Sequence, residues 1–133
     1  MPRFTRWAAR LALIYLVVGF TFGGLLLSNK GVSYAPGLWR LRPAHIEFLF
    51  AGWMVQLALG VAHWIIPRFR GGRFGRVELA WLALGLLNGG ILLVSFGALA
   101  GLPTWAPVVG RAMEGAAALA YLIYIWPRIR PLS

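Results

Sequence analysis

Two histidines and one glutamine lie on one side of the long apolar segment AHIEFLFAGWMVQLALGVAHWII, where their types and spacing suit them to bind a cofactor. His45, Gln56 and His63 are separated by eleven and then seven residues. At about 100° per residue of an α-helix, these steps bring all three side chains to the same face. Gly52 lies close to the same line and would leave a low surface that a flat molecule could approach. Placing an ionisable side chain inside a membrane costs free energy, so such residues usually have a function. The sequence contains no other histidine, and function is therefore expected on this face.

His45 is the first candidate for an axial ligand of haem iron. A neutral imidazole on a helix is a common ligand of b-type haem, and an interfacial histidine that binds water or lipid headgroups is the alternative. His63 lies about 27 Å farther along the helix axis, so it could ligate only a second haem or lie at the opposite membrane surface. Met113, in a later apolar run, is another candidate iron ligand. Gln56 could hydrogen-bond a cofactor or the backbone of a neighbouring helix.

Three arginines fall at the level of His45 and could bind the carboxylates of a haem: Arg40, Arg42 and Arg111. A guanidinium pairs with a carboxylate through two parallel hydrogen bonds, and snorkelling to lipid phosphates is the alternative. Arg111 also precedes Glu114 by three residues, a spacing that predicts an ion pair within one helix. Glu47 points about 200° away from His45 and is expected to face another helix or the membrane surface.

The elements that position these residues are predicted to be membrane-spanning helices. The 133 residues are 60% hydrophobic and 12% charged, with a mean hydropathy of +0.75, values that no soluble domain of this size would show. Four apolar runs can each cross a hydrocarbon core of about 30 Å: 7–28, 44–66, 77–100 and 108–126. Residues 1–133 are therefore expected to form a single all-α domain, an integral membrane four-helix bundle.

Two further features of the sequence limit this interpretation. The first apolar run is followed by no small-residue cleavage site, so it is expected to remain as a helix and not to act as a signal peptide. Cysteine is absent, so any haem would be held without thioether links.

The placement of basic residues predicts the orientation of the bundle. Positively charged loops favour the cytoplasm. Basic residues concentrate before the first run, between the second and third, and after the fourth: Arg3, Arg6, Arg10, Arg68, Arg70, Arg73, Arg76, Arg128 and Arg130. The opposite side has Lys30, Arg40 and Arg42. Both termini are therefore predicted to lie in the cytoplasm, with the chain in a bacterial inner membrane. An anionic lipid surface accounts for the net charge of +10, and nucleic acid is not an expected partner.

The stretch LWRLRPAHIEFLFAGWMVQLALGVAHWIIPRF resembles the second transmembrane helix of heme-copper oxidase subunit I, especially in the cbb-type oxidases and nitric oxide reductases. In that family an arginine-containing approach leads to a histidine at the outer start of an aromatic and glycine-rich helix. The resemblance implies that His45 is an axial ligand of a low-spin haem b. It covers residues 38–69 well and the first four helices of the family loosely.

This sequence also departs from the family. The catalytic subunits have later helices that supply the second low-spin ligand, the high-spin haem ligand and the copper-binding histidines, and these positions are absent here. Reduction of oxygen or nitric oxide by this chain alone is therefore not expected. The second axial ligand stays open among three candidates. One is His45 of a second copy, in a two-fold homodimer in which the polar stripes of the two chains (His45, Gln56 and His63) face each other. The others are Met113 and a vacant position that binds a gas.

The sequence thus predicts a b-type haem protein that transfers electrons or senses a diatomic gas. One alternative is a haem-free structural or assembly subunit of a respiratory complex, which the four-residue glycine steps favour: Gly19–Gly23, Gly85–Gly89 and Gly97–Gly101. A second is a quinol-binding anchor in which His63, Gln56 and nearby aromatic residues hold a quinone ring. Transport is disfavoured, because no discontinuous helix pair surrounds a charge at the midplane.

Overall fold

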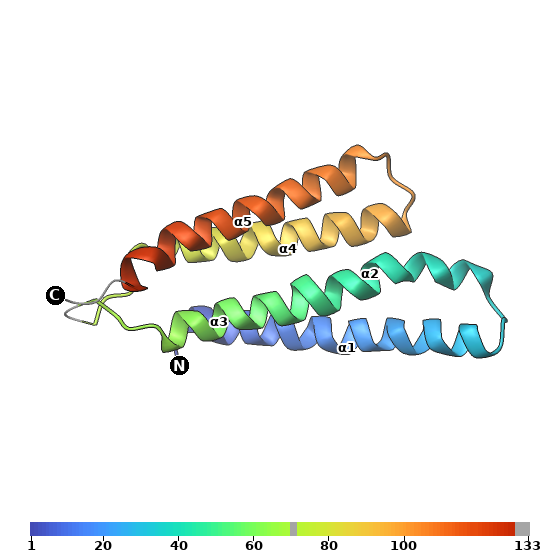
Figure 1. The fold of residues 1–133 in the computed structure, drawn as a ribbon, viewed down its shortest axis with the longest axis horizontal. Coiled ribbons are helices and arrows are strands. Elements are labelled where there is room, and N and C mark those ends of the chain that lie inside the picture. The colour runs from blue at the N-terminus through green and yellow to red at the C-terminus, as the bar shows by residue number, and fades with distance from the viewer. Residues whose placement is uncertain (70–71, 130–133) are drawn as a thin grey trace.

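The computed structural model describes residues 1–69 and 72–129, and within them the chain contains helices and no strand (Figure 1). The elements are α1 (Arg3–Gly31), η1 (Pro36–Leu41), α2 (Arg42–Glu47), η2 (Phe48–Val55), α3 (Gln56–Ile65), α4 (Val77–Leu99) and α5 (Trp105–Ile129). The short η1 is a 3-10 helix and η2 is a π-helix; together with α2 and α3 they form one rod, Pro36–Ile65. Arg70 and Arg130, which contribute to the predicted orientation, lie outside the described residues.

Four helices in the described part of the chain are long and apolar enough to cross a membrane: Arg3–Gly31, Pro36–Ile65, Val77–Leu99 and Trp105–Ile129. The prediction of an all-α fold with four helices of spanning length is confirmed, and it indicates a multi-pass membrane protein. The largest difference from the predicted boundaries is at the second helix, which begins at Pro36 instead of Ala44. Pro36 and Pro43 each lie in the first turn of a helical element. The backbone N–H groups of a first turn have no acceptor within the helix, so a proline there costs no hydrogen bond.

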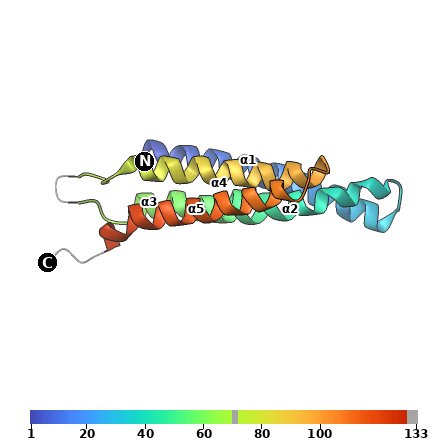
Figure 2. The same cartoon turned by 90° about the horizontal axis from the view of Figure 1, so that it is seen from above.

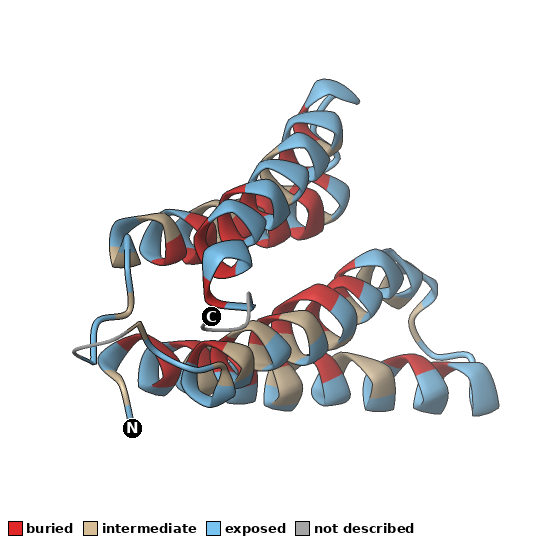
Figure 3. Cartoon of the chain, turned by 60° about the vertical axis from the view of Figure 1, so that its left-hand side comes forward, coloured by how far each residue is buried: buried red, intermediate tan, exposed pale blue. Residues whose placement is uncertain are grey.

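The four long helices form two antiparallel hairpins that lie side by side. The first hairpin pairs α1 with the Pro36–Ile65 rod, and the second pairs α4 with α5 (Figure 1). In the perpendicular view, the tip of the first hairpin again projects beyond the turn between α4 and α5 (Figure 2). Buried residues lie on the sides that the helices turn toward one another (Figure 3). Large apolar side chains such as Val17, Leu27 and Val108 are exposed on the outside, as expected for helices that face lipid.

Glycines allow the helices of each hairpin to approach closely. A Cβ at Gly60 would lie 2.9 Å from Cβ of Ala8, and one at Gly90 would lie 2.6 Å from the carbonyl oxygen of Gly110. Of the predicted glycine steps, the members Gly19, Gly23, Gly89 and Gly97 pack against neighbouring helices, whereas Gly85 and Gly101 meet no atom within 4 Å. Small residues therefore serve packing within each hairpin of this chain.

Candidate functional site

His45 is held against α1 by one hydrogen bond and one glycine. Its Nδ1 lies 2.7 Å from the carbonyl oxygen of Gly19, and the ring covers Gly23, where a Cβ would lie 2.6 Å from Cε1. A carbonyl oxygen only accepts hydrogen bonds, so Nδ1 of the neutral ring carries the proton and Nε2 carries the lone pair. The side chain is half-buried. The imidazole is thus fixed in the tautomer in which Nε2 can bind a metal.

The surroundings of His45 resemble those of a metal-binding histidine in one respect. Metal-binding histidines commonly donate the second ring N–H to a backbone carbonyl or carboxylate, as His45 does to Gly19. In residues 1–69 and 72–129, no group of three or more histidine or acidic side chains gathers to hold an ion. A haem needs only axial ligands from the protein, so one oriented imidazole suits it.

The other residues expected to hold a haem are dispersed in the structure. Arg40, in η1, and Arg42, at the start of α2, are both exposed near the projecting tip of the first hairpin. Met113 lies against Gly89 inside the second hairpin, whereas His45 packs on α1 of the first. His45 and Met113 therefore have different neighbours and are not brought together. The two exposed arginines can bind an anion from solvent or lipid.

The surface at Gly52 is covered by an aromatic ring of the same chain. A Cβ at Gly52 would lie 2.5 Å from Cγ of Tyr15, so the ring of Tyr15 occupies the low surface that the sequence predicts. Tyr15 also packs on Phe48 at a ring-centroid distance of 5.1 Å. Gly52 therefore serves the packing of α1 against η2.

Gln56 belongs to a hydrogen-bonded network that joins three helices. It is fully buried; its Oε1 accepts from Nδ2 of Asn88 at 2.7 Å, and its Nε2 donates to the carbonyl oxygen of Ala8 at 3.4 Å. Asn88 also donates to the carbonyl oxygen of Leu84 and accepts from the hydroxyl of Tyr15 at 2.9 Å. Of the two roles that the sequence allows Gln56, the network gives it the one in helix packing.

His63 is buried in an aromatic cluster at the other end of the rod. Its Nδ1 is 2.7 Å from the hydroxyl of Tyr124, and its ring lies 4.6 Å from that of Phe4 and 4.7 Å from that of Phe74. Arg128 donates to the Tyr124 hydroxyl at 2.6 Å and to the carbonyl oxygens of His63, Ile66 and Pro67. These bonds satisfy the carbonyl groups at the end of α3, a task for which the guanidinium fork is suited.

A pocket of about 440 Å³ opens beside His63, between Phe4, Phe74 and Trp81. Gln56 is not among the residues that line this pocket. The two polar side chains of the expected quinol site are therefore not brought together.

The predicted stripe does face one neighbour, although its geometry differs from the prediction. His45, Gln56 and His63 all contact α1, through Gly19, Ala8 and Phe4 respectively. The intervening residues Phe48–Val55 form a π-helix, whose bonds link residues i and i+5, so the α-helical angle per residue does not hold across it. Because α1 of the same chain covers the stripe, two such stripes cannot face each other along their length, and the expected form of the dimer interface is corrected accordingly.

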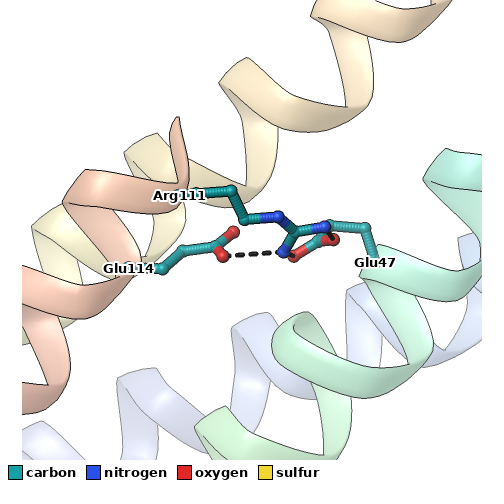
Figure 4. Close-up of polar contacts among 3 residues, drawn as sticks. All are labelled: Glu47, Arg111 and Glu114. Atoms are coloured by element: carbon teal, nitrogen blue, oxygen red, sulfur yellow. Dashed lines mark hydrogen bonds and ion pairs between the residues drawn. The ribbon is translucent and has the colours of Figure 1, made fainter. Parts of the chain in front are cut away.

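Arg111 lies between two carboxylates, as Figure 4 shows. Its Nη1 donates to Oε1 of Glu47 at 3.0 Å and to Oε2 of Glu114 at 2.8 Å, and its Nη2 lies 2.7 Å from Oε2 of Glu47. The predicted pair of Arg111 with Glu114 is confirmed, and Glu47 faces another helix, α5, as expected. The sequence contains only three acidic residues, so two of them meet at this arginine. Arg111 is thereby committed to side chains of its own chain.

Comparison with protein families, with curated proteins and with solved structures finds no match for this chain.

Proposed function

We propose that this chain is a b-type haem-binding protein of a bacterial inner membrane that takes part in electron transfer or in sensing a diatomic gas. The observation that carries the proposal is the bond of His45 Nδ1 to the carbonyl oxygen of Gly19, which leaves Nε2 as the ligating nitrogen. The bound haem would supply a one-electron couple, and a diatomic gas would bind it only by replacing one of the two histidines.

The residues around His45 have distinct tasks in this proposal. Gly19 fixes the tautomer and direction of the ring, and Gly23 leaves the space that the ring occupies. Arg40 and Arg42 are exposed near the same end of the rod and would pair with the haem carboxylates. The chain's own side chains thus orient the ligand and bind the anionic groups.

We infer that His45 of a second copy would supply the second protein ligand of the haem. No other histidine lies near this end of the chain, and Met113 packs on Gly89 in the other hairpin. A closed two-fold pair would supply two imidazoles from one surface. Because α1 covers much of the stripe, the contact between copies would be confined to the exposed part of His45 and the tip of the first hairpin.

The basic residues of this end support an orientation with His45 toward the outer face and both termini in the cytoplasm. Exposed basic residues are more numerous at the opposite end, which has Arg3, Arg6, Arg10, Arg68, Arg73 and Arg76, than at this end, which has Lys30, Arg40 and Arg42. Electron transfer or gas sensing would then take place near the outer surface.

The experiment is a haem titration of the detergent-purified chain. We expect a Soret band and a reduced-minus-oxidised spectrum of b type, with one haem per two chains by pyridine haemochrome assay and protein quantification. His45→Ala should abolish the bands, while His63→Gln, which changes the other histidine, should retain them. Circular dichroism verifies that each variant is helical. A helical wild-type protein without a Soret band, or a His45→Ala variant with full haem content, would refute the proposal.

A further inference from the structure

The pocket beside His63 contains one polar atom of a buried side chain that has no partner. The volume of the pocket is about 440 Å³, within the range of about 300–1,000 Å³ that small-molecule sites occupy. His63 lines the pocket, although the residue is only 1% exposed. Its Nδ1 faces Tyr124, whereas its Nε2 makes no hydrogen bond in the described part of the chain and is not among the fully enclosed polar atoms that lack one. Nε2 therefore keeps accessible surface, and the pocket is the space that this ring lines.

The bonds of Tyr124 determine that Nε2 carries a hydrogen. The Tyr124 hydroxyl accepts from Nη1 of Arg128 at 2.6 Å and lies 2.7 Å from Nδ1 of His63. Tyr124 is 3% exposed, and the described residues offer its O–H no acceptor except Nδ1, so the hydroxyl donates to Nδ1. In the neutral imidazole the proton is then on Nε2, and a protonated imidazole carries one there as well. In both states the pocket meets an N–H donor.

Positive charge surrounds this donor. Arg3 lines the pocket and is exposed. The Cζ atoms of Arg68 and Arg128 lie 4.4 Å and 5.2 Å from the ring centroid of Phe74, which also lines the pocket. No carboxylate is among the described residues that line it, and the first turn of α1, which borders it, has no side-chain cap. A buried N–H donor, guanidinium groups and the free N–H groups of a helix start all favour an anion.

The position of the pocket indicates where the anion comes from. The pocket lies where α1 begins, α3 ends and α4 begins (Figure 1). Three exposed tryptophans lie near these same helix ends: Trp7, Trp64 and Trp81. Tryptophan is enriched where a membrane meets water, which is the level of lipid headgroups. Trp81 also lines the pocket, so the pocket joins an anion site to an apolar surface that faces lipid.

We propose that this pocket binds the phosphate of an anionic phospholipid. A phosphate oxygen accepts from His63 Nε2 and the phosphate charge pairs with Arg3, while the acyl chains lie outside the pocket against Trp81. A zwitterionic phospholipid is the weaker match, because its ammonium group would meet guanidinium groups and no lining carboxylate. Free phosphate is also weaker, since it leaves the aromatic walls uncovered. The site is at the opposite end of the chain from His45 and does not depend on haem.

The test measures binding of tritiated phosphatidylglycerol to the detergent-purified full chain. Unlabelled phosphatidylglycerol, phosphatidylethanolamine and phosphatidylcholine with identical acyl chains compete for the site, as does inorganic phosphate. We expect one saturable site per chain and a preference of about tenfold or more for phosphatidylglycerol, because only this lipid has a phosphate without a compensating ammonium. Equal competition by the three lipids, displacement by an equal concentration of inorganic phosphate, or the absence of a saturable site would overturn the proposal.

A pair of arginine variants separates the pocket from the general positive charge of the chain. Arg3→Gln and Arg6→Gln each remove one exposed charge from the start of α1, but only Arg3 lines the pocket. Arg3→Gln should weaken binding of phosphatidylglycerol by about threefold or more, and Arg6→Gln should leave it unchanged. Equal effects of the two substitutions would mean that the lipid responds to net charge alone, and the proposed site would be wrong.

A second pair of variants tests the donor. His63→Phe keeps an aromatic ring in the cluster and removes Nε2, so binding should weaken by about tenfold. Tyr124→Phe removes the same hydrogen bond between His63 and Tyr124 but leaves Nε2 able to donate, so binding should change by less than about twofold. Circular dichroism verifies that both variants are helical. Unchanged binding in His63→Phe, or an equal loss in both variants, would exclude His63 as the donor.

Discussion

The imidazole of His45 lies directly on Gly23: a Cβ at this glycine would be 2.6 Å from Cε1 and 3.0 Å from Nδ1 of the ring. The adjacent Gly24 would place a Cβ where no atom lies within 4 Å. Two neighbouring glycines of α1 therefore differ in whether a methyl group would reach the proposed iron ligand. They form a matched pair for testing how strictly the ring must be placed.

Gly23→Ala is expected to displace the His45 ring from the carbonyl oxygen of Gly19 and to weaken haem binding by about tenfold or more, the usual effect of losing an orienting contact of a metal ligand. Gly24→Ala should bind haem as the unaltered chain does. Haem titrations followed at the Soret band measure both affinities. Equal weakening in the two variants would show that the position of the ring on α1 is unimportant.

The Tyr15–Asn88–Gln56 network should contribute to stability in a graded way. Asn88→Ala removes its side-chain bonds to Tyr15, Gln56 and Leu84 and leaves Gln56 Oε1 buried without a donor, so we expect a loss of about 1–2 kcal/mol. Tyr15→Phe removes one bond and should lower the unfolding free energy by about 0.5–1 kcal/mol. Unfolding in mixed detergent micelles, followed by circular dichroism, measures both. A larger loss for Tyr15→Phe would contradict this assignment.

The four helices could be predicted from the sequence because long apolar runs have few alternatives in a membrane protein. The run 77–100 differs by one residue from α4 (Val77–Leu99). The start of the second helix could not be predicted as well. Polar residues and prolines around Pro36 read as loop, yet this stretch continues the rod outward as a 3-10 helix that ends where α2 begins. An apolar pattern gives no signal for a helix that is built from polar residues and prolines.

Removal of the guanidinium between Glu47 and Glu114 should destabilise the chain more than removal of either carboxylate charge. Arg111→Met leaves two carboxylates near each other, one of them on a side chain only 4% exposed. We expect a loss of the order of 2 kcal/mol, less than for a fully buried pair because the Arg111 side chain is 58% exposed. Glu47→Gln in the Arg111→Met background should recover part of this loss. Additive effects of the two substitutions on the unfolding free energy would exclude the coupling.

Arg128→Lys should loosen the end of α3. An ammonium cannot reproduce the fork that reaches the Tyr124 hydroxyl and the carbonyl oxygens of His63, Ile66 and Pro67. We expect faster amide hydrogen exchange at Ile65 and Ile66, measured by mass spectrometry in detergent. Arg73→Lys changes an exposed arginine of the same connection and should leave these rates unchanged. Unchanged exchange in both variants would mean that the fork does not hold the helix end.

The candidate site shows where sequence reasoning stops. The pair of Arg111 with Glu114 follows from a spacing of three residues, but the bond from Arg111 to Glu47 joins residues 64 apart and depends on how two hairpins meet. The π-helix at Phe48–Val55 has no clear signature in an apolar run, and the packing of Gly52 against Tyr15 depends on a residue of another helix. The covering of Gly52 therefore could not be foreseen.

From the sequence, Arg128 is expected only as a basic residue after the fourth apolar run, and Tyr124 has no expected role. The two nevertheless stand four residues apart on the last helix and so share a face of it. That face carries a hydroxyl and a guanidinium near the end of an apolar run, and it contacts His63 in the structure. The spacing is the only signal that could have identified them.

The division into two hairpins bears on how the protein assembles. The described polar side-chain contacts between the hairpins include Asn88 with Gln56, Tyr121 with the carbonyl of Leu59, Tyr124 with His63 and Arg111 with Glu47. Each helix completes its main-chain bonds internally, so either half can enter a bilayer without waiting for the other. In a membrane, the two hairpins would then associate after insertion. The few paired side chains between them would select one alignment among the many that apolar surfaces allow.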